Sequence, residues 1–174
     1  LAGTGGIAFH RGQIFVGLRQ LVTQCRRFTQ QPQHLLTGGF ERPLALAQMV
    51  LEGVALLAQD GKLTLDDDVR KWVPEVPDYG RKITLRHLLH HTSGLRDYTD
   101  LLPLAGARVE DVTTEREALD MISRQKGVEF APGTRYSYCN SGYFLLSIVV
   151  HRASGKSLRA LRGHLARREN GAAV

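Results

Sequence analysis

Two residues near position 140 carry side chains that could move a proton and hold a substrate. Tyr138 and Asn140 lie in "APGTRYSYCNSGY", residues 131–143, directly before an apolar run. A phenol beside a cation can act as a general base because the positive charge lowers its pKa. An amide two residues away could bind a substrate amide or a lysine. The alternative, which the spacing alone favours, is that Asn140 caps a helix beginning at Ser141 while Tyr138 packs.

Two further residue pairs have spacings that are typical of catalytic or metal sites. Ser123 and Lys126 form a Ser-x-x-Lys, in which a desolvated lysine one helical turn away could activate a serine. Their surroundings, "DMISRQKG", indicate the polar end of an exposed helix, which favours a chance match. His87 and His91 resemble half of a zinc-protease motif, but Leu88 occupies the position of its glutamate. We therefore expect structural or capping histidines, with no metal and no cofactor.

The two cysteines and the charge give weaker indications. Cys139 lacks a histidine at a telling spacing, so a small packed residue is favoured over a nucleophile, and one bridge between Cys25 and Cys139 has no support. The net charge is +6, and most of it falls from Arg152 onward. A basic tail could bind nucleic acid or acidic lipid, but without interleaved aromatic residues a solvated terminus is favoured.

The pattern of apolar residues and turn signals predicts mainly helices. These helices are expected to form one soluble domain over residues 1–174. Of the 174 residues, 43% are hydrophobic, and no apolar run reaches the length of a membrane span. A short hairpin is predicted at 6–16, and a buried helix at 44–58, closed by the turn "QDGK". The remaining predictions are a helical turn at 67–72, a helix from its N-cap Thr84 to Gly94, a helix over 114–126, a turn at Pro132–Gly133 and a helix over 141–153.

Three stretches together resemble the serine β-lactamase and DD-peptidase superfamily, and in particular class C β-lactamases, penicillin-binding proteins and related esterases. They are "LLAQDGKLTLDDDVRKWVPEVPD", "ITLRHLLHHTSGLRDY" and "EFAPGTRYSYCNSGYFLLSIVVHRASGKSL", within residues 51–158. The resemblance implies an α+β fold and hydrolysis of β-lactams, peptides or esters through an acyl-enzyme, in an extracytoplasmic setting. It implies that Tyr138 is the general acid/base, that Asn140 contacts the substrate or a lysine, and that Ser93 is scaffold.

The chain departs from that family at the nucleophile. The family's serine and lysine belong in the helix before "DGKL", where Leu44 and Ala47 stand, or "GFER" at 39–42 if a short insertion is allowed. Residues 18–36 do not resemble the family, and a change of reading frame between residues 17 and 51 would account for this. The Lys/His-x-Gly strand expected after the last helix is also missing from the sequence.

These departures lead to the expectation of an incomplete domain, with the helical region and N-terminal strands but without the C-terminal strands. The activity is expected to be lost or impaired, because an acyl-enzyme needs its nucleophile. The alternatives are a non-catalytic fragment or binding module and, less favoured, a basic nucleic-acid or membrane-surface binder. The expected partner is a small-molecule, peptide or ester substrate rather than a nucleic acid.

Overall fold

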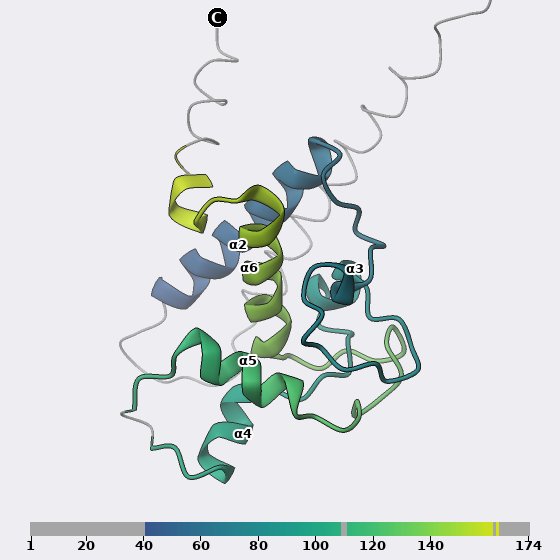
Figure 1. The fold of residues 1–174 in the computed structure, drawn as a ribbon, viewed down its shortest axis with the longest axis vertical. Helices are drawn as coiled ribbons and strands as arrows, with labels where there is room; N and C mark the ends of the chain where they lie inside the picture. Colours follow the sequence, from purple (N-terminus) through teal and green to yellow (C-terminus); the bar gives the residue numbers. More distant parts are fainter. Residues whose placement is uncertain (1–40, 109–110, 162, 164–174) are drawn as a thin grey trace, which may run out of the picture. The chain divides into compact units, whose positions relative to one another are not determined.

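The computed structural model describes residues 41–108, 111–161 and 163 (Figure 1). The chain divides into two compact units, residues 1–63 with 158–174, and residues 64–157. Among the described residues the structure is helical, with no β-strand and a single isolated antiparallel bridge between Asp68 and Thr84. The predicted hairpin at 6–16 and the segment 18–36 lie outside the described residues, so the strands, like the single domain over 1–174, stay predictions.

The described part of the first unit is dominated by α2, Glu41–Gln59, which confirms the helix predicted over 44–58. Its apolar residues Val50, Val54 and Leu57 are buried, whereas Leu46 is 53% exposed. The helix ends in a turn in which the backbone N–H of Lys62 donates to the carbonyl of Leu57 at 2.9 Å. Gly61 takes a φ of +69° there, a conformation that glycine adopts without steric cost.

The second unit begins with two short helices whose first residues are capped by side chains. Asp68 caps the 3-10 helix η1, Val69–Lys71, which confirms the predicted helical turn. Thr84 caps α3, Leu85–Leu89, as predicted, and a reciprocal bond from its own N–H to His87 completes a capping box. The backbone N–H of Val69 donates to the carbonyl of Ile83 at 2.9 Å, so the two caps lie side by side.

Three longer helices complete this unit: α4, Tyr98–Leu104, α5, Glu115–Ser123, and α6, Asn140–Ser154. Helix α6 packs against α3 and α4, and α5 packs against α4 (Figure 1). Gly142 permits the close approach of α6 to α3, since a Cβ at this position would lie 3.1 Å from the carbonyl oxygen of Leu88. Leu88, Leu145 and Leu146 are fully buried, so the core of the unit lies along α6.

Two helices end earlier than the pattern predicts. Helix α3 ends at Leu89 rather than near Gly94, because the chain turns at His91, which has a φ of +54°. Helix α5 ends at Ser123 rather than at Lys126, with Arg124 as its C-cap. None of the helices among the described residues is long and apolar enough to cross a bilayer.

Candidate active site

Tyr138 and Asn140 are joined by a hydrogen bond at the start of α6. The phenol oxygen of Tyr138 donates to Oδ1 of Asn140 at 3.0 Å, and Nδ2 of Asn140 donates to Oδ2 of Asp97 at 2.7 Å. The N-cap of α6 is Cys139, which makes no side-chain capping bond. The alternative in which Asn140 caps a helix starting at Ser141 is therefore wrong, because its amide is bonded to Tyr138 and Asp97 instead.

Asp97 links the starts of two helices and was not predicted as a site residue. It is the N-cap of α4, where its Oδ1 accepts from the N–H and the hydroxyl of Thr99 at 2.9 and 2.7 Å. Its Oδ2 accepts from the backbone N–H of Asn140 at 2.7 Å as well as from the amide. A carboxylate is favoured at this end of α6, where unpaired N–H groups carry a partial positive charge.

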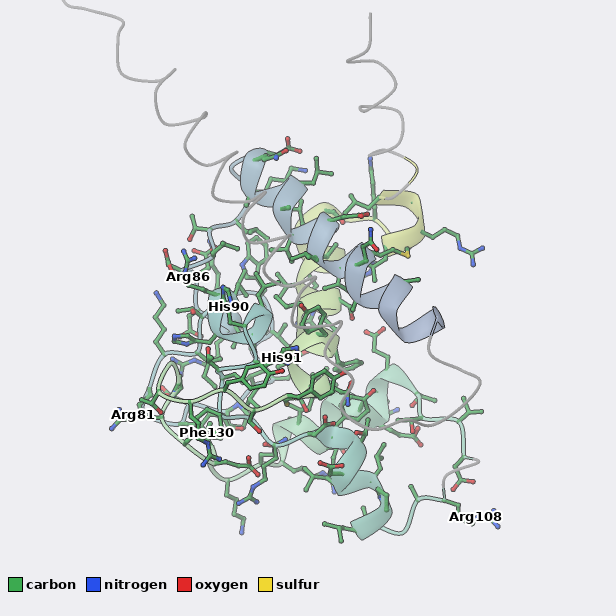
Figure 2. All side chains as sticks on the ribbon, turned by 180° about the vertical axis from the view of Figure 1, so that it is seen from behind. Arg81, Arg86, His90, His91, Arg108 and Phe130 are labelled. Atoms are coloured by element: carbon green, nitrogen blue, oxygen red, sulfur yellow. The ribbon has the colours of Figure 1, made fainter. Side chains whose placement is uncertain are left out.

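His91 contacts the segment that carries Tyr138 and holds its backbone through two hydrogen bonds. Its Nδ1 accepts from the N–H of Cys139 at 3.2 Å, and its carbonyl accepts from the N–H of Ser137 at 2.9 Å. Its ring stacks on Tyr143 of α6, at a centroid distance of 5.1 Å, and also contacts Tyr138 at 4.7 Å. Figure 2 shows His91 beside α6. The histidine therefore fixes the residues on either side of Tyr138.

Burial sets the protonation of the groups around the phenol. His91 is only 5% exposed, and desolvation lowers its pKa from 6.5 to about 4, so the ring is neutral at pH 7. Desolvation, followed by the charge of Asp97, raises the pKa of Tyr138 above 10.0. The phenol, which is 59% exposed, therefore offers a proton at neutral pH and does not act as a base in this state.

The other candidate residues are used for structure. His87 takes part in the capping box of Thr84, and His91 lies beyond α3, so the two histidines do not share a helical face. Ser123 donates its hydroxyl to the carbonyl of Asp120 at 2.9 Å at the end of α5, and Lys126 lies past that end. No group of three or more metal-ligating side chains occurs in the described part of the chain.

Cys139 is packed inside, as predicted. The residue is 3% exposed, and its Sγ donates to the carbonyl of Leu95 at 3.2 Å. Desolvation raises the pKa of the thiol, which keeps it protonated and unreactive at neutral pH.

Two buried polar side chains tie the loop before α4 to the rest of the unit. Ser141 is fully buried, and its hydroxyl donates to the carbonyl of Arg96 at 2.7 Å and accepts from the N–H of Tyr98 at 2.9 Å. Gln125 accepts from the N–H of Arg96 at 3.1 Å and donates to its carbonyl at 3.2 Å. Both residues are distant in sequence from their hydrogen-bond partners, so the local sequence pattern could not have predicted these bonds.

The sequence and structure also match known proteins. The family model described as Beta-lactamase matches residues 50–166, more than half of the chain. The chain belongs to the beta-lactamase family. Its sequence is 36% identical over 107 residues to penicillin-binding protein 4* of Bacillus subtilis and 38% identical over 96 residues to a D-aminopeptidase of Cereibacter sphaeroides. These matches cover 60% and 55% of this chain, but only 23% and 18% of the two relatives.

A solved structure has a similar fold over about two thirds of this chain. The D-amino acid amidase of Ochrobactrum anthropi SV3, in complex with D-phenylalanine, superposes with a TM-score of 0.54 at 30% sequence identity. The match covers 65% of this chain and 36% of the amidase. The chain thus corresponds to about a third of the amidase's length and to about a fifth of the curated relatives' length.

All serines of this beta-lactamase family member lie in the second half of the chain. No serine precedes Ser93 and no lysine precedes Lys62, so α2 carries neither. Ser93 is 1% exposed and accepts from the N–H of Leu95 at 3.3 Å, which fits the scaffold role that the resemblance implies. Tyr138 and Asn140, the residues to which the resemblance assigns a site role, therefore occur in a sequence that has no serine–lysine pair on the helix before "DGKL".

Proposed function

We propose that this chain carries the proton-transfer part of a serine hydrolase site that acts on small acyl compounds such as D-amino acid amides. The observation that supports this most is the exposed phenol of Tyr138, bonded to Asn140 at 3.0 Å at the start of α6. The relatives support the substrate class, since their names describe a D-aminopeptidase and a D-amino acid amidase.

In this proposal Tyr138 donates the proton and Asn140 orients the substrate. A protonated phenol can give its proton to the leaving amine when an acyl bond breaks, and the carbonyl of Asn140 holds that phenol in place. To work as a base in the opposite direction, the phenol would need a nearby cation, because its pKa is raised here. In the family that the sequence resembles, the lysine one helical turn from the serine would be such a cation.

We also propose that the chain by itself does not form an acyl-enzyme. Leu44 and Ala47 occupy the positions where the family's serine and lysine are expected. The basic-binder alternative has little support from the described residues, because Arg152, the first basic residue of the predicted tail, pairs with Glu75 at 2.6 Å. A binding module that retains the Tyr138–Asn140 element is the stronger alternative to an active hydrolase.

Titration with D-phenylalanine amide and its L-enantiomer, followed by amide-resolved NMR, tests the proposal. We expect saturable shifts at the amides of Tyr138 and Asn140 that are larger for the D form, without release of ammonia. The matched variant is Tyr136→Phe, which removes a neighbouring phenol and should leave the binding unchanged, whereas Asn140→Leu should abolish it. Equal shifts for both enantiomers, or shifts that persist in Asn140→Leu, would contradict the proposed site.

A further inference from the structure

Asp97 lies 43 residues before Asn140 in the sequence, yet its carboxylate contacts Asn140 twice. We propose that Asp97 is a positioning residue that fixes the direction of the hydrogen bond between Tyr138 and Asn140, so that the phenol is always the donor. The role given to Tyr138 rests on the proposed function, but the direction of the bond does not.

The direction follows from which groups can donate. An ionised carboxylate only accepts hydrogen bonds, so the side chain of Asn140 must present its Nδ2 to Asp97. The Oδ1 of the same amide then faces Tyr138, at 3.0 Å from the phenol oxygen. An amide oxygen cannot donate, so the hydrogen in this bond has to come from the phenol.

Asp97 can impose this orientation because it is itself held in place. Its Oδ1 accepts from the N–H and the hydroxyl of Thr99, and its Oδ2 accepts from the backbone N–H of Asn140. Together with the bond from Nδ2 of Asn140, these make four bonds on two oxygens, which leave the carboxylate little freedom to rotate away. Charge-assisted bonds such as these are roughly twice as strong as bonds between neutral groups.

Removal of the charge should reverse the bond. With Asn at position 97, the new amide could donate to Oδ1 of Asn140, and the amide of Asn140 would then turn its Nδ2 toward the phenol oxygen. A donor facing the oxygen stabilises the phenolate, and the repulsion from Asp97 is lost at the same time. The other groups that act on Tyr138 are Tyr98, Tyr136, Cys139 and the ring of His91, none of which is a cation at neutral pH.

The test is the titration of Tyr138 in the full chain without any ligand. Fluorinated tyrosine, whose phenol titrates at lower pH than tyrosine, would be incorporated, and the ¹⁹F signal of residue 138 assigned with Tyr138→Phe. We expect Asp97→Asn to lower the pKa of residue 138 well below its value in the unmodified chain. The control Asp120→Asn removes an exposed carboxylate paired with Arg124 on α5 and should leave that pKa unchanged.

Two further variants separate positioning from charge alone. In an Asn140→Leu background no amide remains to turn, so Asp97→Asn should lower the pKa much less than it does in the unmodified chain. An equal shift in both backgrounds, or no shift at all, would overturn the inference. If Asp97→Asn fails to fold, as judged by circular dichroism, Thr99→Val loosens the same carboxylate and should shift the pKa in the same direction by less. Because no ligand is present, these outcomes do not depend on whether D-phenylalanine amide binds.

Discussion

The segment at residues 91–97 and the segment at residues 136–140 contact each other but differ in exposure. In the first, His91, Ser93 and Leu95 are 5% exposed or less, whereas in the second Tyr136 and Tyr138 are 44% and 59% exposed. The first segment provides buried acceptors and a ring, and the second presents phenols to solvent on a backbone held by those acceptors. This difference in exposure predicts that stability resides mainly in the supporting segment, while the proposed proton donor lies in the segment it supports.

The largest loss of stability is expected from substitution of Gly94, in the supporting segment, and it would sharpen this contrast most. Its φ is +75°, and a Cβ would lie 2.2 Å from the carbonyl oxygen of Phe130. Gly94→Ala should therefore lower the free energy of unfolding by about 4 kcal/mol, from backbone strain and steric overlap. Gly80→Ala is the control, because Gly80 has a φ of +70° with nothing within 4 Å, and should cost only about 1 kcal/mol. Equal losses of unfolding free energy for Gly94→Ala and Gly80→Ala, measured by denaturant unfolding, would argue against a rigid supporting segment.

The second prediction concerns pH and His91. Its pKa is about 4 in the folded chain and 6.5 for an unperturbed histidine, so the unfolded state takes up the proton first as the pH falls. Stability should be complete above pH 6.5 and decline by about 3 kcal/mol between pH 6.5 and 4, then level off. His91→Asn, which tolerates a positive φ, should flatten this part of the curve.

His90→Asn is the matched control for that pH dependence. Desolvation also lowers the pKa of His90, but this half-buried ring should contribute only a small part of the slope. If the fall in stability between pH 6.5 and 4 disappears in His90→Asn and persists in His91→Asn, the pH dependence does not come from His91.

The third prediction concerns Ser141, which directly follows the second segment and bonds to the carbonyl of Arg96 in the first. Ser141→Ala leaves the N–H of Tyr98 without its acceptor in a buried position and should cost about 2 kcal/mol in unfolding free energy. Ser147→Ala removes a hydroxyl that bonds only within α6, to the carbonyl of Phe144, and should change stability by less than about 0.5 kcal/mol. Thermal melts of the two variants side by side measure the difference, and similar melting temperatures would count against the tie.

The smallest effect on stability is expected at the exposed phenol itself. Tyr138→Phe removes a solvent-exposed hydrogen bond to Asn140 and should change the free energy of unfolding by less than about 1 kcal/mol. The same variant should remove the ¹⁹F signal assigned to the site and weaken binding of D-phenylalanine amide. A loss of stability above about 2 kcal/mol would show that the phenol is part of the support, and the contrast between the two segments would fail.

Local signals in the sequence predicted the elements better than they predicted the site. Thr84 was recognised as an N-cap, and the helix at 44–58 was found, because caps and apolar runs are properties of neighbouring residues. The end of α3 was missed because a positive φ at a histidine has no local sequence signal. Asp97 was missed because its two contacts to Asn140 cross 43 residues, a separation at which only the fold brings side chains together.

We propose above all that Tyr138 and Asn140 belong to a beta-lactamase family site and that this chain has no serine that can be acylated. Intact-mass measurement after incubation with a fluorophosphonate or a fluorescent β-lactam tests this most directly. We predict an unchanged mass for the full chain and for Ser123→Ala alike, since the hydroxyl of Ser123 donates within α5 and Lys126 lies beyond the helix. A stoichiometric adduct that disappears in Ser123→Ala, or in any other serine variant, would contradict it.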